Sequence, residues 1–175
     1  MSKDNFQTLG TILAIAISLL ALAVSIYEAN LLKAQQRAMV WPHFTIAGSF
    51  SERGFSFVAT NFGTGPAIIE SVEVRFKDSL ISDHDDLLDR INPQREIGYD
   101  RIKMSTLNQT VFKAGEERVV FNMPWDDETR EMATQMRYVT IKVQYKSVLG
   151  ERWIFDSETN DHIPGEFQSE LEFMN

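Results

Sequence analysis

The feature that most constrains this chain is an uncharged run of 23 residues, 5–27, which lies between Asp4 and Glu28. As a helix, a run of this length spans about 34 Å, whereas the hydrocarbon core of a bilayer is about 30 Å thick. The run holds ten Leu, Ile or Val residues, and together they favour insertion by about 5 kcal/mol. We therefore predict a transmembrane helix over residues 8–28, with residues 1–7 as an N-terminal flank.

Small side chains recur along one face of this predicted helix, at Gly10, Ala14, Ser18, Ala21 and Ser25. Such a seam lets helix backbones approach closely in lipid, where packing and hydrogen bonds drive association. The pattern alone is weak, because small residues are also common in membrane helices that do not associate. We interpret the seam as a candidate assembly face and expect a homo-oligomer.

A cleavable secretory signal is the alternative interpretation of the same segment. The stretch Ala21-Leu22-Ala23 has the small residues of a cleavage site, and cutting there would leave a mature chain that begins at Val24. The first four residues are nearly neutral, and apolar residues continue past the supposed cut to Tyr27. Both features favour an uncleaved anchor over a signal peptide.

The segment after the anchor, residues 29–41, predicts a helical stalk. It lacks Gly and Pro before Pro42 and is rich in residues that favour helices. The residue before a proline avoids the helical conformation, so we expect the helix to end just before Trp41. Lys33 and Arg37 outweigh the single Lys3 on the other side of the anchor, which favours a cytoplasmic C-terminal domain.

From residue 42 to residue 158 the pattern changes to that of a mainly β domain, followed by an acidic C-terminal tail over residues 159–175. A slip in the alternation between Ile69 and Val72 predicts a bulge. We predict a β-sandwich or small barrel with two short helical insertions, the first capped by Ser82 and the second beginning at Pro124. The expected strands are 43–50, 54–60, 67–77, 97–104, 109–112, 118–123, 138–146 and 152–155, and the expected helices are 82–91 and 124–137.

A glycine-rich turn formed by Asn61, Gly63, Gly65 and Pro66 is the densest local motif. A Rossmann fingerprint would need a third glycine and then a helix, whereas here a proline and an extended run follow. Two glycines suit a turn with positive φ, the Asn61 side chain can bond its own backbone, and Pro66 directs the exit. We therefore predict a structural turn and not a nucleotide-binding loop.

The anchor, the stalk that ends at Pro42 and the Asn-x-Gly-x-Gly-Pro-Ala turn together resemble a widespread group of uncharacterised bacterial single-pass membrane proteins. Residues 143–153 and the turn at 114–116 are similar to that group as well, whereas 82–101 and the tail after Asp156 are not. The resemblance implies an immunoglobulin-like sandwich, a bacterial source and no catalytic residues. We therefore expect the anchor to lie in a bacterial inner membrane.

The composition argues against several classes of function. Residues 42–175 hold 14 basic and 23 acidic side chains, a net formal charge of −9, so we expect no direct binding of DNA or RNA. The chain has no Cys, its three histidines are far apart in sequence, and no catalytic motif occurs. The acidic run from Asp83 to Asp89 lacks the spacing of a calcium loop and suits a helix N-terminus. We expect no enzyme activity, no cofactor and no metal.

One cluster could bind an anionic ligand, because it combines cations with aromatic rings on a predicted hairpin. Its members are Lys142, Tyr145, Lys146, Arg152 and Trp153. Aligned hairpin faces would let cation and ring cradle a small nucleotide. The simpler interpretation is that Lys142 and Lys146 are solvated lysines on the outer face of a strand.

Three hypotheses about function remain. The first is a membrane-anchored, non-enzymatic interaction or sensor module that binds a protein partner. The second is a nucleotide-gated membrane effector of bacterial antiviral defence, motivated by the seam and the cationic cluster. The third is a secreted or periplasmic β domain released by signal cleavage.

Overall fold

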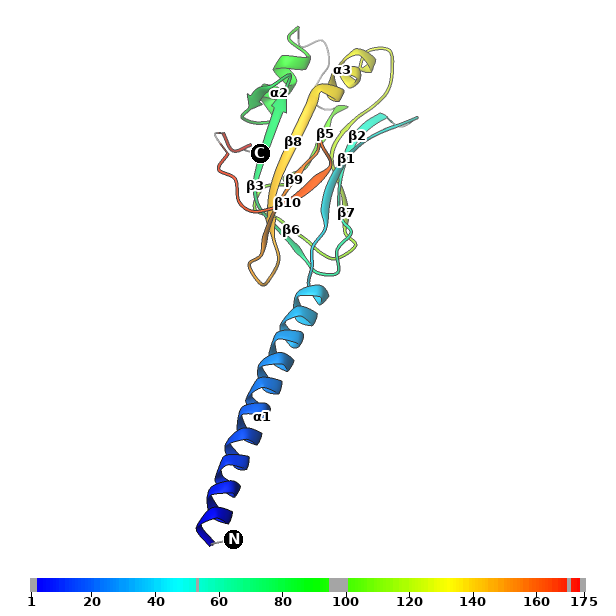
Figure 1. Ribbon diagram of the computed structural model, residues 1–175. Helices are drawn as coiled ribbons and strands as arrows, with labels where there is room; N and C mark the ends of the chain where they lie inside the picture. Colours follow the sequence, from blue (N-terminus) through cyan, green and yellow to red (C-terminus); the bar gives the residue numbers. More distant parts are fainter. Residues whose placement is uncertain (1–2, 53, 95–100, 170, 174–175) are drawn as a thin grey trace. The chain divides into compact units, whose positions relative to one another are not determined.

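A computed structural model describes residues 3–52, 54–94, 101–169 and 171–173. The chain divides into two units, Met1–Met39 and Val40–Asn175, which are drawn together in Figure 1. The first unit holds a single helix, α1 (Lys3–Met39), and the second holds the strands and the remaining helices. Each unit is described by itself below.

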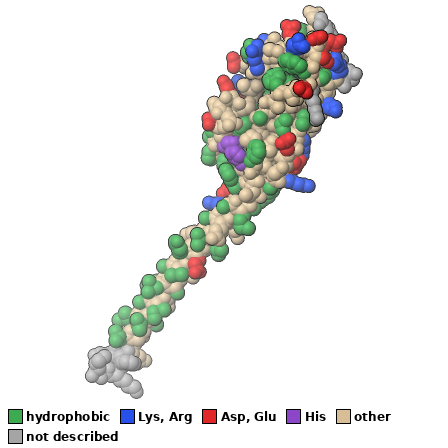
Figure 2. Space-filling model, turned by 90° about the vertical axis from the view of Figure 1, so that its right-hand side faces the viewer, with side chains coloured by type: hydrophobic (Ala, Val, Ile, Leu, Met, Phe, Trp, Pro, Cys, Tyr) green, Lys and Arg blue, Asp and Glu red, His purple; other side chains and the backbone are tan. Residues whose placement is uncertain are grey.

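Helix α1 runs without a break through the predicted anchor and stalk. Its stretch Gln7–Met39 is long and apolar enough to cross a bilayer, and none of its most apolar window is buried. Apolar side chains therefore dominate its surface, as Figure 2 shows. The helix ends at Met39, two residues before the residue that precedes Pro42.

The second unit is mainly β, with its strands in two antiparallel sheets. The first sheet has the order β1 (Phe44–Ser51), β2 (Gly54–Asn61), β7 (Glu117–Met123) and β5 (Lys103–Met104). The second has the order β10 (Asp161–Pro164), β9 (Arg152–Asp156), β8 (Val139–Lys146), β3 (Ala67–Phe76) and β4 (Ser79–Ile81), with β6 (Val111–Phe112) also paired to β3. No described strand joins the two sheets, so they form two layers rather than the alternative small barrel.

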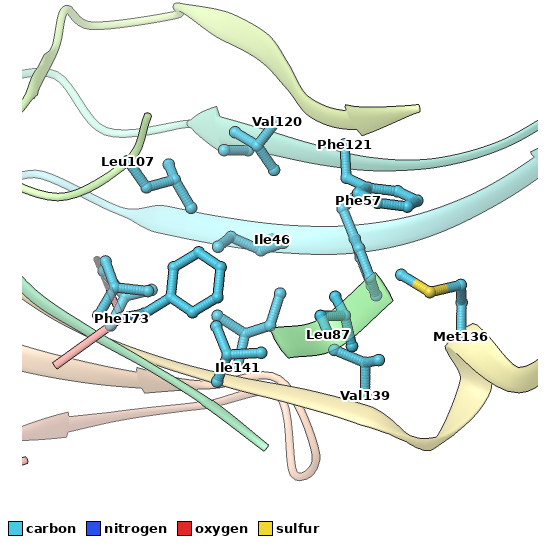
Figure 3. Packing of buried hydrophobic residues seen from close by; sticks show 14 of the residues in the cluster. Ile46, Phe57, Leu87, Leu107, Val120, Phe121, Met136, Val139, Ile141 and Phe173 are labelled. Atoms are coloured by element: carbon cyan, nitrogen blue, oxygen red, sulfur yellow. The ribbon is translucent and has the colours of Figure 1, made fainter. Parts of the chain in front are cut away.

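The core lies between these two layers. Phe57 and Val120 come from the first sheet and Val139 and Ile141 from the second, and they meet in the middle (Figure 3). Phe44, Phe112 and Phe155 are fully buried, together with Tyr145. Strand β8 alternates strictly between buried and half-buried residues, as expected for a strand with one face on the core.

Two local predictions about the second sheet are confirmed. The pairing of β3 with β8 shifts register between Ile69 and Ser71, which is the bulge that the slipped alternation predicted. Strands β8 and β9 form the predicted antiparallel hairpin, in which Tyr145 lies opposite Trp153 and Lys146 opposite Arg152. The bulge leaves Glu70 between two paired residues, and this position matters for the site described below.

The first inserted helix, α2 (His84–Ile91), is present, but its predicted cap is wrong. Asp83, not Ser82, is the N-cap: its Oδ1 accepts a hydrogen bond from the backbone N–H of Asp86 at 2.9 Å. The Ser82 hydroxyl instead donates to Asp83 Oδ2. A carboxylate at this position also benefits from the positive end of the helix.

The second inserted helix is shorter than predicted. Helix α3 covers only Arg130–Gln135 and continues as the 3-10 helix η2 (Met136–Tyr138). The Asp126 carboxylate accepts hydrogen bonds from the backbone N–H groups of Glu128 and Thr129, and the Thr129 hydroxyl donates to the Pro124 carbonyl. These side-chain bonds hold the start of the segment in a turn, which competes with helix formation.

The weaker strand and tail predictions have mixed outcomes. Of the strand expected over 97–104, residues 97–100 lie outside the described residues, and β5 forms only at Lys103–Met104. The first part of the segment expected to be a tail belongs to the second sheet as β10. Further along, Phe173 is buried and its N–H donates to the Val72 carbonyl.

Candidate functional site

The five residues of the predicted ligand cluster do not form one surface. Tyr145 is only 1% exposed and stacks on Trp153 at a centroid distance of 5.8 Å, on the core side of the hairpin. Lys146 and Arg152 pair with each other on the opposite side. The strict alternation of β8 causes this separation, because residues next to each other on a strand point to opposite faces.

The two cations at the end of the hairpin are held by Glu70, the residue at the bulge. Lys146 Nζ lies 2.6 Å from Glu70 Oε1, and Arg152 Nε lies 2.7 Å from Glu70 Oε2. Gln144 is a third partner, and its Nε2 donates to Glu70 Oε2 at 3.0 Å. The Arg152 hydrogen bond is the largest cause that lowers the pKa of Glu70 to about 2, so the carboxylate stays charged at neutral pH.

The remaining cation of the cluster is paired as well. Lys142 lies 3.1 Å from Asp156, which is nearly buried. Arg152 makes a second ion pair with Glu166 at 2.7 Å. Three cations therefore face three carboxylates, and an anionic ligand would have to displace them.

A depression of about 490 Å³ lies beside this ion-pair cluster. Among the residues that the structure describes, its wall includes Glu70, Glu166 and Glu172 but only one cation, Arg152. Such a charge balance disfavours a nucleotide phosphate, which prefers an excess of cations. Sequence reasoning missed Glu70 because a residue at a bulge is not assigned to either face by alternation.

The glycine-rich turn is a clamp on the segment that enters the domain, residues 41–43. The buried Asn61 side chain accepts hydrogen bonds at Oδ1 from the backbone N–H groups of His43 and Gly63. Its Nδ2 lies within hydrogen-bond distance of the carbonyls of Gly65, Phe112 and Lys113. One side chain therefore ties the start of β1 to the turn after β2 and to the end of β6.

The glycines of this turn are needed for a different reason from the one predicted. Neither has positive φ. A Cβ on Gly63 would lie 2.3 Å from the Trp41 carbonyl oxygen, and one on Gly65 would lie 2.2 Å from the Val40 carbonyl oxygen. The glycines permit close approach of two backbones, and Thr64 N–H then donates to the Trp41 carbonyl at 2.8 Å. The predicted bond of Asn61 to its own backbone is present.

A pair of histidines from opposite ends of the domain sequence lies next to this clamp. The rings of His43 and His162 are 4.1 Å apart, and His162 Nδ1 lies 3.1 Å from the Tyr145 hydroxyl. Burial first, and then the neighbouring His43, lower the pKa of His162. Burial raises the pKa of Tyr145 to about 12. His43 Nδ1 is buried without a hydrogen-bond partner. The sequence offered no signal for this pairing across about 120 residues.

The acidic run at the start of α2 serves the helix. Asp83 caps it, and Asp86 pairs with Arg90 at 2.8 Å. The His84 ring packs edge-on against Phe173 at 4.8 Å, and burial lowers its pKa. Within the described part of the chain, no three His, Cys, Asp or Glu side chains are grouped closely enough to hold a metal ion.

The predicted seam lies on a helix whose described side chains are all exposed. Ser18 donates its hydroxyl to the Ala14 carbonyl at 2.8 Å, so this polar group is satisfied within the helix. No side chain would be displaced by a Cβ on Gly10. The seam is therefore open along its length and is compatible with either lipid or a second helix.

Comparison with known proteins places the chain in a family. Residues 6–163 match the family described as a domain of unknown function (DUF8453). The match covers the membrane-type helix and both sheets, and the chain belongs to this family. No curated protein matches the chain, and no solved structure does.

Proposed function

We propose that this chain is a bacterial single-pass membrane protein, a non-enzymatic interaction module that assembles as a homo-oligomer and binds a protein partner. The observation that supports this proposal best is helix α1, whose described side chains are exposed along its length. Leu9, Leu19 and Ile26 are each more than half exposed. A helix of this kind needs lipid or other helices as its environment.

We further propose an immunoglobulin-like identity for the β domain. The supporting observation is strand order: β1-β2-β7-β5 corresponds to the A-B-E-D sheet of an immunoglobulin domain. In the second sheet, β9-β8-β3 corresponds to G-F-C, with β4 following as an added edge strand. Domains of this architecture support many unrelated functions, so function must come from their surfaces.

The anchor is tested by fractionating cells that express the full chain. We expect the protein in the membrane fraction after carbonate washing, with an intact N-terminus by mass spectrometry. A mature chain beginning at Val24 would support the secreted alternative and remove the anchor from the proposal. Protease treatment of inside-out and right-side-out vesicles tests the proposed cytoplasmic location of the domain.

Binding of a protein partner is tested by cross-linking and affinity capture of the tagged full chain from native membranes. The proposal requires a stoichiometric partner that survives detergent exchange and is lost when residues 42–175 are removed. The nucleotide-gated alternative receives little support from the cationic cluster, since Glu70 and Glu166 already pair with its cations. Calorimetry with cyclic and linear nucleotides would revive that alternative if it measured binding.

A further inference from the structure

Strand β1 forms one edge of the first sheet, and it carries no charged residue or proline. The strand pairs with β2 along its whole length, and no described strand covers its other side. It is eight residues long and is exposed from Ala47 to Ser51. Natural proteins usually protect such edges with lysines, prolines, bulges or short strands.

An exposed aromatic side chain, called the knob here, and a groove with a mixed polar and apolar lining lie together on this edge. Phe50 is 56% exposed although its ring contacts Phe55 at a centroid distance of 4.7 Å. A groove of about 330 Å³ runs beside Ile46 and Gly48, and on its far side it is lined by Val139 of the second sheet and by Met136 and Arg137 of η2. Phe50 lines the end of the same groove, two residues along the strand from Gly48.

We propose that β1 pairs with β1 of a second copy of this chain, antiparallel and centred on Gly48. This inference rests on the homo-oligomer proposed above and names the surface that would form it. In an antiparallel pair, residues directly opposite each other share a face. Centring on Gly48 therefore places each Phe50 opposite Ile46 of the other copy, at the mouth of its groove.

The knob and the groove make this edge self-complementary, which is what a two-fold interface requires. In such a dimer, the Phe50 side chain of each copy would enter the groove of the other copy. A glycine on the axis also brings no side chain of its own to the centre of the pair.

Charge favours a second copy at this edge as well. The domain carries a net formal charge of −9, so two copies repel each other over most of their surfaces. Strand β1 is neutral from Phe44 to Ser51 and permits close approach without that penalty. Tethering to one membrane would raise the effective concentration of copies further.

The first test measures the mass of the full chain in detergent micelles by light scattering, with matched substitutions. We expect a dimer for the wild-type chain and a twofold loss of protein mass for A47K and for F50S. The controls are V119K, which adds the same charge to the exposed face of β7, and F62S, which removes another exposed phenylalanine. Both controls should remain dimeric.

The second test uses the absence of cysteine from the chain. Pairing centred on Gly48 places residue 47 opposite residue 49 of the other copy, at a Cα separation that a disulfide can span (about 4.5–5.5 Å). Differently tagged A47C and S49C chains, co-expressed and then oxidised in isolated membranes with copper phenanthroline, should therefore form a mixed disulfide dimer. V119C with S49C should not.

The outcomes separate this inference from the function on which it rests. A wild-type dimer that persists in A47K and F50S and gives no A47C–S49C disulfide would overturn edge pairing and leave the homo-oligomer standing. A wild-type chain that is monomeric in micelles and in lipid nanodiscs would overturn both edge pairing and the homo-oligomer. The membrane anchor would be unaffected by either result.

Discussion

Helix α1 and the β domain differ in how far their apolar side chains are exposed. In the helix, large side chains such as Leu20 are 67% exposed, whereas in the domain Phe44 is fully buried. The domain therefore supplies its own apolar environment, and the helix depends on one from outside. Substitutions in the β domain should affect its folding, and substitutions in helix α1 should affect insertion into the membrane.

The largest effect on domain stability, without an effect on membrane insertion, is expected for Phe44→Ala. The ring is fully buried and contacts Phe112 and Tyr145 at centroid distances of 5.0 and 5.8 Å. Its removal should destabilise the domain by about 3–5 kcal/mol, without releasing the chain from the membrane. Thermal unfolding of the detergent-solubilised chain measures the first effect, and fractionation measures the second. The control Phe62→Ala, at a 69% exposed position, should change stability by less than about 0.5 kcal/mol.

The reverse separation is expected for Leu19→Lys, near the centre of the predicted span. Exchanging leucine for lysine there should oppose insertion by about 3 kcal/mol. Only about 2 kcal/mol of the insertion free energy would then remain. We therefore expect a small part of the chain in the soluble fraction, while the domain keeps its unfolding temperature. Leu32→Lys, in the predicted stalk, is the matched control and should leave the chain in the membrane. Equal release by both variants would show that the span and the stalk are not distinct.

A third substitution, Asn61→Ala, tests how firmly the domain holds the segment that follows the helix. It leaves the buried N–H groups of His43 and Gly63 without their acceptor, so we expect a loss of about 2–3 kcal/mol. Hydrogen exchange should increase at residues 41–43 and 61–65 more than in β8. Within the described residues, Asn122→Ala removes one side-chain bond, of 3.4 Å to the Phe55 carbonyl, and is the control. Uniform exchange across the domain would mean that Asn61 supports the whole fold rather than the entry segment.

Comparison of sequence and structure shows which physical signals are readable in advance. Long-period patterns succeeded: the apolar run predicted α1, and alternation predicted β8, the β8–β9 hairpin and the bulge before Ser71. The predictions were wrong at the starts of the two short helices. The N-cap is Asp83 and not Ser82, and a turn replaces the predicted helix at Asp126, because individual side-chain hydrogen bonds decide both. Propensity does not decide such competition.

The candidate site was less predictable than the fold, because it depends on contacts between distant segments. The cations of the hairpin were identified, but their partner Glu70 lies 76 residues before Lys146. The need for Gly63 and Gly65 was recognised, yet the cause is the backbone of residues 40–43 and not positive φ. Tertiary proximity of this kind cannot be derived from local periodicity.

A smaller effect is expected for Glu70→Gln, which removes the shared carboxylate of Lys146 and Arg152. Both cations are about a third exposed, so solvent screens the pair and we expect a loss of about 1–2 kcal/mol at neutral pH. The pKa of Glu70 is lowered from 4.5 to about 2 in the folded chain. Its stabilisation is therefore present above pH 4.5 and is lost as the pH falls toward 2. Unfolding by urea from pH 7 to pH 3 should show wild type converging on Glu70→Gln, whereas a constant difference would contradict the ion pair.

The smallest expected effect concerns His162, where burial and His43 lower the pKa from its ordinary value of 6.5. A lowered folded pKa means that the unfolded chain binds the proton more tightly, so stability should fall as the pH drops below about 6.5. His84, buried against Phe173, has a lowered pKa as well and should contribute in the same direction. The carboxylate of Asp161 opposes the effect at His162 by raising its pKa. His162→Phe should reduce the slope of the free energy of unfolding against pH between pH 7 and pH 5. His84→Phe should reduce the slope as well, by its own contribution. If the double variant kept the wild-type slope, carboxylates and not the buried imidazoles would cause the pH dependence of stability.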